Sequence, residues 1–218
     1  MFKPNISIPR PPMVKDKNRV EGLRADTLYK LSMNNGESGP LEINDQGFYH
    51  FYTEGSSSAG YTVYRFTSDY PYITTAMQMI MPLRYISSGS EFKALYNAKN
   101  KKKAVNDFWI KLSGDEHRAK NMIKLFYNRV QNANINFAAD REGWMTDRGM
   151  IFIIYGAPDV VYRDSEMETW QYGNYKNNKA MIFNFYKVKN PFSNSYYVMQ
   201  RDESYRISWI KAIEVWRK

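Results

Sequence analysis

The 218-residue sequence contains no cysteine and only two histidines, His50 and His117. Without cysteine the chain can form no disulfide framework, no thiolate nucleophile and no cysteine-based zinc or iron–sulfur site. Neither histidine has a second ligand at a spacing such as H-x-x-x-H. The sequence therefore predicts no metal site and no cofactor.

Long apolar segments are also absent. Uninterrupted apolar runs such as residues 151–155 fall far short of the roughly 20 residues that cross a bilayer, so we expect no transmembrane segment. The first residues, MFKPNISIPRPP, lack the apolar core and the small-residue cleavage site of a secretory signal. This proline-rich start is more typical of an arm or an edge strand than of the beginning of a domain. The protein is therefore either cytosolic or a mature or trimmed fragment, and the proline-rich start favours the fragment.

Recognised catalytic motifs are missing as well. The sequence has no G-x-S-x-G nucleophile elbow, no phosphate-binding P-loop and no G-x-G-x-x-G dinucleotide motif, which disfavours an enzyme. A hydrolase stays open as an alternative because four acidic residues lie close together: Asp159, Asp164, Glu166 and Glu168. A strand over residues 149–155 would hold Asp147 and Asp159 more than about 20 Å apart. An acid pair would therefore have to join Asp159 to Glu166 or Glu168.

Alternating aromatic residues predict strands in the first third of the chain. Residues 41–44 and 48–53 flank a turn at residues 45–47, which predicts a hairpin. Residues 61–66 alternate in the same way, so three or more antiparallel strands would form a partial β-sandwich. We expect residues 1–70 to be the β-rich end of an upstream domain.

Helical spacing of apolar residues begins after residue 73. A short helix should end at Pro82, and the S-x-x-E sequence that begins at Ser88 predicts a capping box for the next helix. Apolar residues at three- and four-residue spacings then predict helices before and after the Gly114-Asp115 break, the second extending to Phe137. Trp209, Ala212, Ile213 and Trp216 predict a C-terminal helix.

Short apolar runs between these last helices predict an antiparallel meander. The expected strands are residues 149–155, 168–172, 180–188 and 196–199. Residues 71–218 should therefore form an α+β domain, in which a helical layer of residues 75–138 packs on a sheet of residues 149–200. The predicted core comprises Trp109, Phe126, Trp144, Ile151, Ile153, Trp170, Phe183 and Phe185.

Positive charge is concentrated in the middle of the chain. The formal net charge is +9, yet residues 1–70 hold 8 basic and 8 acidic residues, whereas residues 71–112 hold 7 and 2. The centre of this excess is a lysine cluster: Lys99, Lys101, Lys102 and Lys103. This cluster indicates polyanion or nucleic-acid binding as an alternative function, with neighbouring Tyr and Phe side chains stacking on bases. Because no nucleic-acid-binding motif accompanies it, we regard nucleic acid as an unlikely partner.

Residues 141–149, REGWMTDRG, contain several residues with special conformational or hydrogen-bonding properties just before the apolar run of residues 151–155. Gly143 can adopt a positive φ that turns Trp144 inward as an anchor. Thr146 and Asp147 have short side-chain oxygens that can bond the local backbone at the start of the expected strand. The segment is thus either a structural corner or the edge of a binding cleft beside Trp144.

Arg148 completes this segment and needs a carboxylate partner. The candidates near it in the sequence are Asp147, Asp159 and Glu142. We group Gly143, Trp144, Thr146, Asp147, Arg148 and Asp159 as the candidate motif or binding residues, with no catalytic residue among them.

GWMTDRG followed by YGAPD resembles the GWxTD-domain family, a group of largely uncharacterised bacterial proteins. The resemblance is carried by Gly143, Trp144, Thr146, Asp147, Arg148, Gly149, Tyr155, Gly156, Pro158 and Asp159. Residues 82–86, 91–109 and 168–170 are also similar to the family, so the resemblance spans about residues 75–218. It implies a location in the envelope of Bacteroidota-like bacteria, in the periplasm or at the outer membrane, commonly with a lipoprotein-type signal that anchors the protein. It implies no established activity and no catalytic residues.

Together these observations favour a non-enzymatic protein-binding or assembly module of the cell envelope. Its expected partners are other envelope proteins, because the many Tyr and Trp side chains provide contact area at low entropic cost. Polyanion binding through the lysine cluster and hydrolysis through the acidic residues remain the alternatives.

Overall fold

The computed structural model describes residues 8–15, 26–55, 60–173, 180–190 and 193–218. Along the chain the elements are β1 (Gly47–Tyr52), β2 (Gly60–Arg65), α1 (Ala76–Ile80), the 3₁₀ helix η1 (Met81–Tyr85), α2 (Gly89–Asn97), α3 (Lys101–Ser113), α4 (Glu116–Phe137), the 3₁₀ helix η2 (Gly143–Met145), α5 (Asp147–Tyr155), β3 (Val160–Arg163), β4 (Met167–Tyr172), β5 (Met181–Lys187), β6 (Tyr197–Met199) and α6 (Tyr205–Trp216). The fold is α+β, as predicted.

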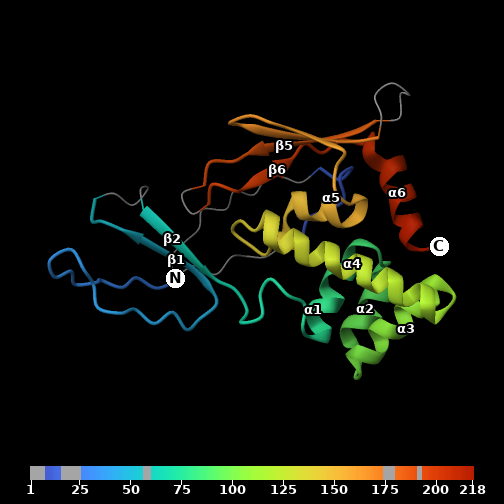
Figure 1. Cartoon of the computed structure of the whole chain (residues 1–218), viewed down its shortest axis with the longest axis horizontal. Helices are drawn as coiled ribbons and strands as arrows, with labels where there is room; N and C mark the ends of the chain where they lie inside the picture. The colour runs from blue at the N-terminus through green and yellow to red at the C-terminus, as the bar shows by residue number, and fades with distance from the viewer. Residues whose placement is uncertain (1–7, 16–25, 56–59, 174–179, 191–192) are drawn as a thin grey trace.

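The larger sheet is an antiparallel meander in the order β3-β4-β5-β6. Helices α4, α5 and α6 lie against one of its faces, and α1, α2 and α3 form the far side of the helical layer (Figure 1). Inward-facing aromatic residues of β4 and β5 meet these helices: Phe137 of α4 lies 5.2 Å from Trp170, and Tyr155 of α5 lies 5.1 Å from Phe183, between ring centroids. All eight predicted core residues are buried.

Helix α4 is the longest element because its sequence supplies both a start signal and a continuous apolar face. The Asp115 side chain caps its N-terminus by accepting the Arg118 N–H (2.8 Å). Phe126 and Val130 then lie one turn apart on its buried side. Trp109 of α3 packs on Phe126 with 5.3 Å between ring centroids. The predicted helices on either side of the Gly114-Asp115 break are therefore confirmed.

One predicted strand is wrong: residues 149–155 belong to helix α5. This helix is central, packed between α4, the sheet and α6, and most of its residues are buried. A helix enclosed on all sides is apolar all round and loses the 3.6-residue alternation of a surface helix. Its short apolar run therefore imitates a buried strand. The first strand of the meander is instead β3.

The predicted hairpin between residues 41–44 and 48–53 is also wrong. Residues 41–44 form no strand, and β1 pairs with β2 in antiparallel register, with Phe48 opposite Tyr64. These two rings make an edge-to-face contact at 4.6 Å, which is a stronger cross-strand pair than residues 41–44 could offer. We expected a partial β-sandwich of three or more strands in this region. Within the described residues, the region contains a single two-stranded sheet. The division into domains at residue 70 stays a prediction.

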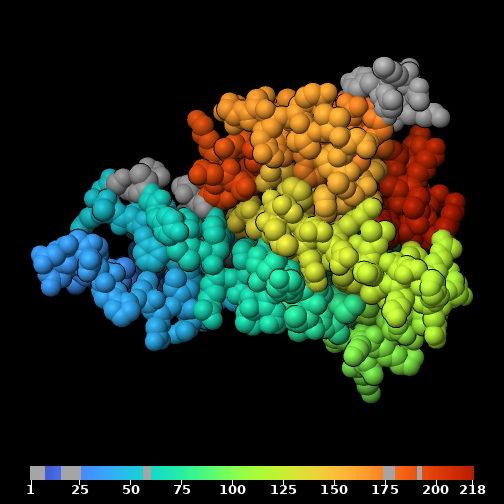
Figure 2. Space-filling model, in the orientation of Figure 1, coloured from blue at the N-terminus to red at the C-terminus, as the bar shows by residue number. Residues whose placement is uncertain are grey.

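Residues 26–55 and 60–65 form a lobe at one end of the molecule, away from α6 (Figure 2). The segment that follows β2 joins this lobe to the helices. Tyr70 donates its hydroxyl to the carbonyl of Asn134 on α4 (2.6 Å), and the Asn134 side chain donates to the carbonyl of Pro71 (3.1 Å). The segment that follows the lobe is thus bonded to α4, the helix on which the GWMTD segment packs.

Candidate functional site

The two glycines at the ends of the GWMTDRG segment permit close packing. Gly143 does not have the positive φ that we predicted. Instead, a Cβ atom at Gly143 would lie 1.9 Å from the carbonyl oxygen of Ala133 on α4, and one at Gly149 would lie 1.9 Å from the carbonyl oxygen of Gly143. No side chain can occupy either position without moving the backbone. These glycines let α4, η2 and α5 pack backbone against backbone.

Trp144 is the inward-facing anchor that the sequence predicts, with 2% of its surface exposed. Its backbone N–H donates to Oδ1 of Asn134 (3.1 Å), and its Nε1–H donates to Oε2 of Glu142 (2.6 Å). Burial raises the pKa of Glu142, and this bond opposes the rise. Both polar hydrogens of the tryptophan are therefore satisfied inside the protein.

Thr146 and Asp147 start helix α5, but they act over different ranges. The Thr146 hydroxyl accepts the Gly149 N–H (3.0 Å) and donates to the Gly143 carbonyl (2.8 Å), which confirms its predicted bond to the local backbone. Asp147 reaches across the fold instead. One carboxylate oxygen accepts the Met199 N–H of β6 (2.8 Å), and the other is bound by the Arg201 guanidinium.

Arg148 does not pair with any of the three predicted carboxylates. It donates to Oε1 of Glu168 (3.1 Å) and to the Ser195 carbonyl (2.8 Å), and it stacks on Tyr197 at 4.1 Å from the ring centroid. Burial lowers the pKa of Arg148, while Glu168 opposes this change. Arg163 also binds Glu168 (2.8 Å). The buried carboxylate is therefore neutralised, and Arg148 ties α5 to the sheet.

The acidic residues proposed for hydrolysis do not come together. Asp159 is exposed and accepts the Gly173 N–H (2.6 Å) at one end of β3. Glu166 lies in the turn at the other end of this four-residue strand, so the two Cα atoms are about 13 Å or more apart. Glu168 is already bound by Arg148 and Arg163. Asp147 and Asp159 flank a helix, and the separation derived for a strand does not apply.

The lysine cluster lies on the surface at the start of α3. Lys101, Lys102 and Lys103 occupy the first turn of this helix. Lys103 forms an ion pair with Asp107 (2.6 Å), and Lys101 donates to the Ala98 carbonyl (3.2 Å). The structure thus gathers the lysines on one helix end, and polyanion binding through them stays a prediction.

Within the described residues, no group of three or more His, Asp or Glu side chains is arranged to hold a metal ion. His50 lies in β1 and His117 in the first turn of α4. No helix in the same part of the chain is both long and apolar enough to span a membrane.

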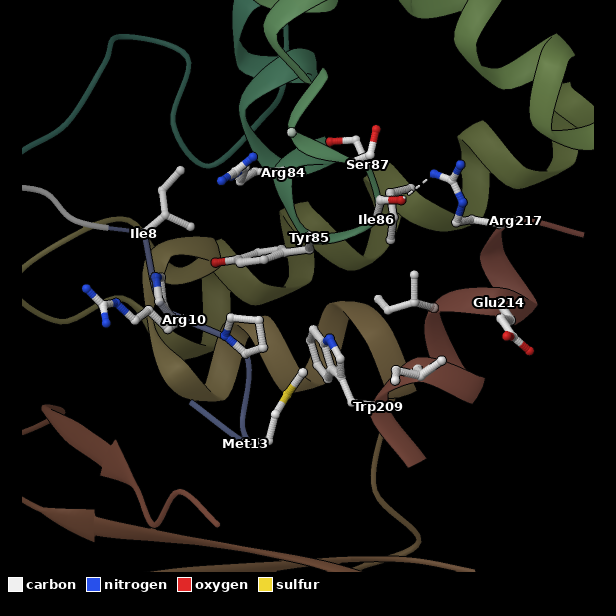
Figure 3. Close-up of a pocket in the computed structure, with 16 residues that line it drawn as sticks. Ile8, Arg10, Met13, Arg84, Tyr85, Ile86, Ser87, Trp209, Glu214 and Arg217 are labelled. Carbon is white, nitrogen blue, oxygen red and sulfur yellow. Dashed lines mark hydrogen bonds between the residues drawn. The ribbon is translucent and has the colours of Figure 1, made fainter. Parts of the chain in front are cut away.

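A groove with a volume of about 660 Å³ lies beside the motif, and its lining residue Tyr85 contacts the motif directly (Figure 3). It is bounded by the N-terminal segment of residues 8–13, by the junction of η1 with α2, and by α6. Its lining is mostly apolar and consists of Ile8, Pro9, Arg10, Pro11, Met13, Arg84, Tyr85, Ile86, Ser87, Ser88, Gly89, Trp209, Ile210, Ile213, Glu214 and Arg217. A groove of this size falls in the range of small-ligand and peptide sites.

The GWMTD segment supports two walls of this groove. Tyr85, in the lining, donates its hydroxyl to the Trp144 carbonyl (2.7 Å). Arg201 binds Asp147 and also donates to the carbonyls of Arg10 and Pro11, the latter at 3.0 Å. Sequence reasoning missed both Tyr85 and Arg201. Neither stands near the motif in the chain, and no local pattern marks either of them.

A family model of the GWxTD domain matches residues 47–218. The chain belongs to the GWxTD domain family. The match extends the resemblance from residue 75 back to residue 47, so it includes the β1–β2 sheet. No curated protein matches the chain. No solved structure matches it either.

The groove of this GWxTD domain is electrically asymmetric. Arg10 and Arg84 lie toward one end, and Arg217 and Glu214 toward the other (Figure 3). Arg217 is neutralised by Glu91, which it binds through both terminal nitrogens (2.9 and 3.0 Å). These bonds lower the pKa of Glu91 to about 2. At the opposite end, the exposed Arg84 forms no ion pair within the described residues, so this end carries positive charge.

One polar group in the groove wall lacks a partner. The Ser87 hydroxyl oxygen is buried and makes no hydrogen bond to any described residue. Burying an unpaired hydroxyl costs about 1 to 3 kcal/mol. Because this oxygen is enclosed by the protein, it is not open to a ligand in the groove.

Proposed function

We propose that this GWxTD domain is a non-enzymatic protein-binding or assembly module of the bacterial cell envelope. Its groove holds an extended segment of a partner protein, with apolar side chains along the floor and an acidic group at the Arg10–Arg84 end. The observation that carries the proposal is the groove itself, whose walls are held in place by Trp144 and Asp147 of the GWMTD segment.

The apolar lining supports binding of apolar side chains. Trp209 of α6 faces Tyr85 and Ile86 across the groove, and Ile213 also lines it. Side chains buried here would leave water, at about 25 cal/mol per Å² of apolar surface. A partner segment needs only two or three such anchors to bind specifically.

The charged end of the groove supports a peptide rather than a hydrocarbon chain. Arg84 is exposed, and in the described part of the chain it forms no ion pair; its guanidinium lies over the Phe92 ring at 5.3 Å. An acidic side chain or a terminal carboxylate of the partner would complement this end.

A second surface supports contacts between proteins. Large apolar side chains are exposed along the N-terminal lobe and the segment after it: Leu28, Tyr29, Leu31, Met33, Leu41, Tyr52, Tyr61 and Tyr72. Soluble monomers seldom expose apolar residues at this density without a binding role. An assembly module would cover part of this surface with its partner.

The envelope location rests on the family to which the chain belongs. We expect the full-length protein in the periplasm or attached to the outer membrane, with other envelope proteins as partners. Cell fractionation with an epitope-tagged protein tests this point. Recovery of the protein in the cytoplasmic fraction alone would contradict the location and leave the groove proposal to be judged separately.

The groove proposal is tested by two substitutions on the same helix. Ile210 lines the groove and is 45% exposed, whereas Val215 is 73% exposed and lies outside the lining. Photo-crosslinking residues placed at positions 210 and 215 in native cells should capture the same partner only from position 210. After the partner has been purified, Ile210→Glu should weaken its binding about tenfold or more, and Val215→Glu should leave it unchanged.

Charge reversal then tests the orientation of the bound segment. Arg84→Glu should weaken binding, and replacing the partner's acidic group by lysine should restore it in that variant. Equal crosslinking from both positions, or equal binding by the Ile210→Glu and Val215→Glu variants, would overturn the proposal.

A further inference from the structure

Within the part of the chain that the structure describes, strand β3 is a free edge of the larger sheet. It pairs with β4 on one side only, and Val160, Val161 and Tyr162 are 38%, 42% and 61% exposed. The strand is short and carries one charged residue, Arg163, but it contains neither lysine nor proline, two residues that commonly protect an open edge. At the other edge of the sheet, β6 is covered: its Met199 N–H is bound by Asp147 of α5. The β3 edge is therefore an open template for another strand.

The hydrogen-bonding groups on this edge follow from the turn between β3 and β4. The Asp164 N–H donates to the Met167 carbonyl (3.0 Å), so the backbone of Asp164 faces β4. Backbone groups alternate along an antiparallel strand. Val160 and Tyr162 therefore face β4 as well, and the N–H and C=O groups of Val161 and Arg163 face outward. The Asp159 N–H departs from this alternation, because it donates to the Gln171 carbonyl of β4 (2.9 Å).

When two copies of this edge run in opposite directions, their side chains complement one another. The sequence of residues 159–163 is Asp-Val-Val-Tyr-Arg. When a second copy pairs antiparallel with its two-fold axis at Val161, Asp159 lies opposite Arg163 and Val160 lies opposite Tyr162. Each position thus meets a residue of opposite charge or of similar apolar character.

The faces of the sheet agree with this register. Val161 and Arg163 lie opposite Trp170 and Glu168 in β4, so both occupy the inner face of the sheet. Arg163 binds Glu168, yet its side chain remains 64% exposed. A shift of the two-fold axis to Tyr162 would place Arg163 opposite Val161, so the arginine would meet no acidic residue of the second copy and would keep only the Glu168 of its own chain. Charge complementarity therefore selects the register centred on Val161.

We propose that the β3 edge binds the β3 edge of a second copy of this chain, joining the two four-stranded sheets into one continuous sheet. Backbone hydrogen bonds from Val161 and Arg163 would hold the pair, and the two Asp159–Arg163 contacts would set its register. Because β3 has only four residues, we expect reversible dimers that form as the protein concentration rises. This proposal does not depend on the groove.

The position of Val161 on the two-fold axis permits a specific test. In a symmetric dimer this residue faces itself, so Val161→Lys and Val161→Asp each place like charges in contact. Sedimentation velocity over a concentration series should detect wild-type dimers and should give dimer dissociation constants at least about tenfold higher for either variant. An equimolar mixture of the two variants should restore dimers with Lys opposite Asp, which native mass spectrometry identifies as heterodimers.

Matched variants control for folding and for other surfaces. Val161→Thr keeps a β-branched residue and should keep the dimer. Val215→Lys, on α6, and Ile210→Glu, in the groove, should also leave dimerisation unchanged, and circular dichroism verifies that each variant is folded. A wild-type protein that stays monomeric throughout the series, or a mixture of charged variants that forms no heterodimer, would overturn the proposal.

Discussion

The two antiparallel sheets of this protein have similar aromatic alternation but very different surroundings. In the four-stranded sheet, Trp170, Phe183 and Phe185 are buried against helices. In the two-stranded sheet, Phe48 is buried, whereas Tyr52 and Tyr61 are exposed. A two-stranded sheet is marginally stable without a covering layer. The comparison teaches that alternation defines a strand, while a second layer supplies most of its stability.

The largest expected difference concerns the inward aromatic residues. Phe183→Ala should lower the free energy of unfolding by about 3 to 5 kcal/mol, because it leaves a cavity under α6. Tyr61→Ala, at a 71% exposed position of β2, should change it by no more than about 0.5 kcal/mol. Urea unfolding of both variants measures this difference. Similar losses would mean that the two sheets are equally covered.

Buried and exposed ion pairs provide the next comparison. Glu168→Ala should cost about 3 kcal/mol, because it leaves Arg148 buried without its carboxylate. In the N-terminal lobe, Lys30 and Glu54 lie 3.8 Å apart with both side chains about 90% exposed, so Glu54→Ala should have no measurable effect. Denaturant titrations of the two variants test the contrast. A stable Glu168→Ala protein would show that the pair contributes little.

A smaller effect is expected at the start of the helix that covers the larger sheet. Thr146→Ala removes the cap of α5 and should cost about 1 kcal/mol. Hydrogen exchange should accelerate at the Gly149 amide, which the Thr146 hydroxyl binds. Amides of β1 and β2 serve as the internal control and should exchange at unchanged rates. Uniform acceleration in both sheets would instead indicate a global loss of stability.

The smallest effect is a dependence of stability on acid pH in the helical layer. Hydrogen bonds from Arg217 lower the pKa of Glu91 from 4.5 to about 2 in the folded protein. The stabilisation is therefore complete above about pH 4.5 and is lost as the pH falls toward 2. Because both side chains are partly exposed, we expect only about 1 kcal/mol. Glu91→Gln should abolish this part of the pH profile, and an unchanged profile would exclude the pair as its source.

The motif illustrates which interactions are readable in a sequence and which are not. The inward orientation of Trp144 and the local bonds of Thr146 were predictable, because a large aromatic residue seeks the core and a short threonine side chain readily bonds the neighbouring backbone. That these bonds cap a helix and not a strand was not predicted. The partners of Asp147 and Arg148 were not predictable. Arg201 and Glu168 lie 54 and 20 residues further along the chain, and only folding brings them near.

The sequence by itself determined the elements whose signals are local. Helix α4 has an Asp cap and an apolar face, α2 has the Ser88 capping box, and β4 and β5 alternate between inward and outward residues. Tertiary structure decided the rest. It made residues 147–155 a helix because they are enclosed on every side, and it required glycine at position 143 because α4 passes 1.9 Å from where a Cβ would lie. It also built the groove from three distant segments. Local propensity acts over a few residues, whereas burial, close approach and cavities depend on the arrangement of the whole chain.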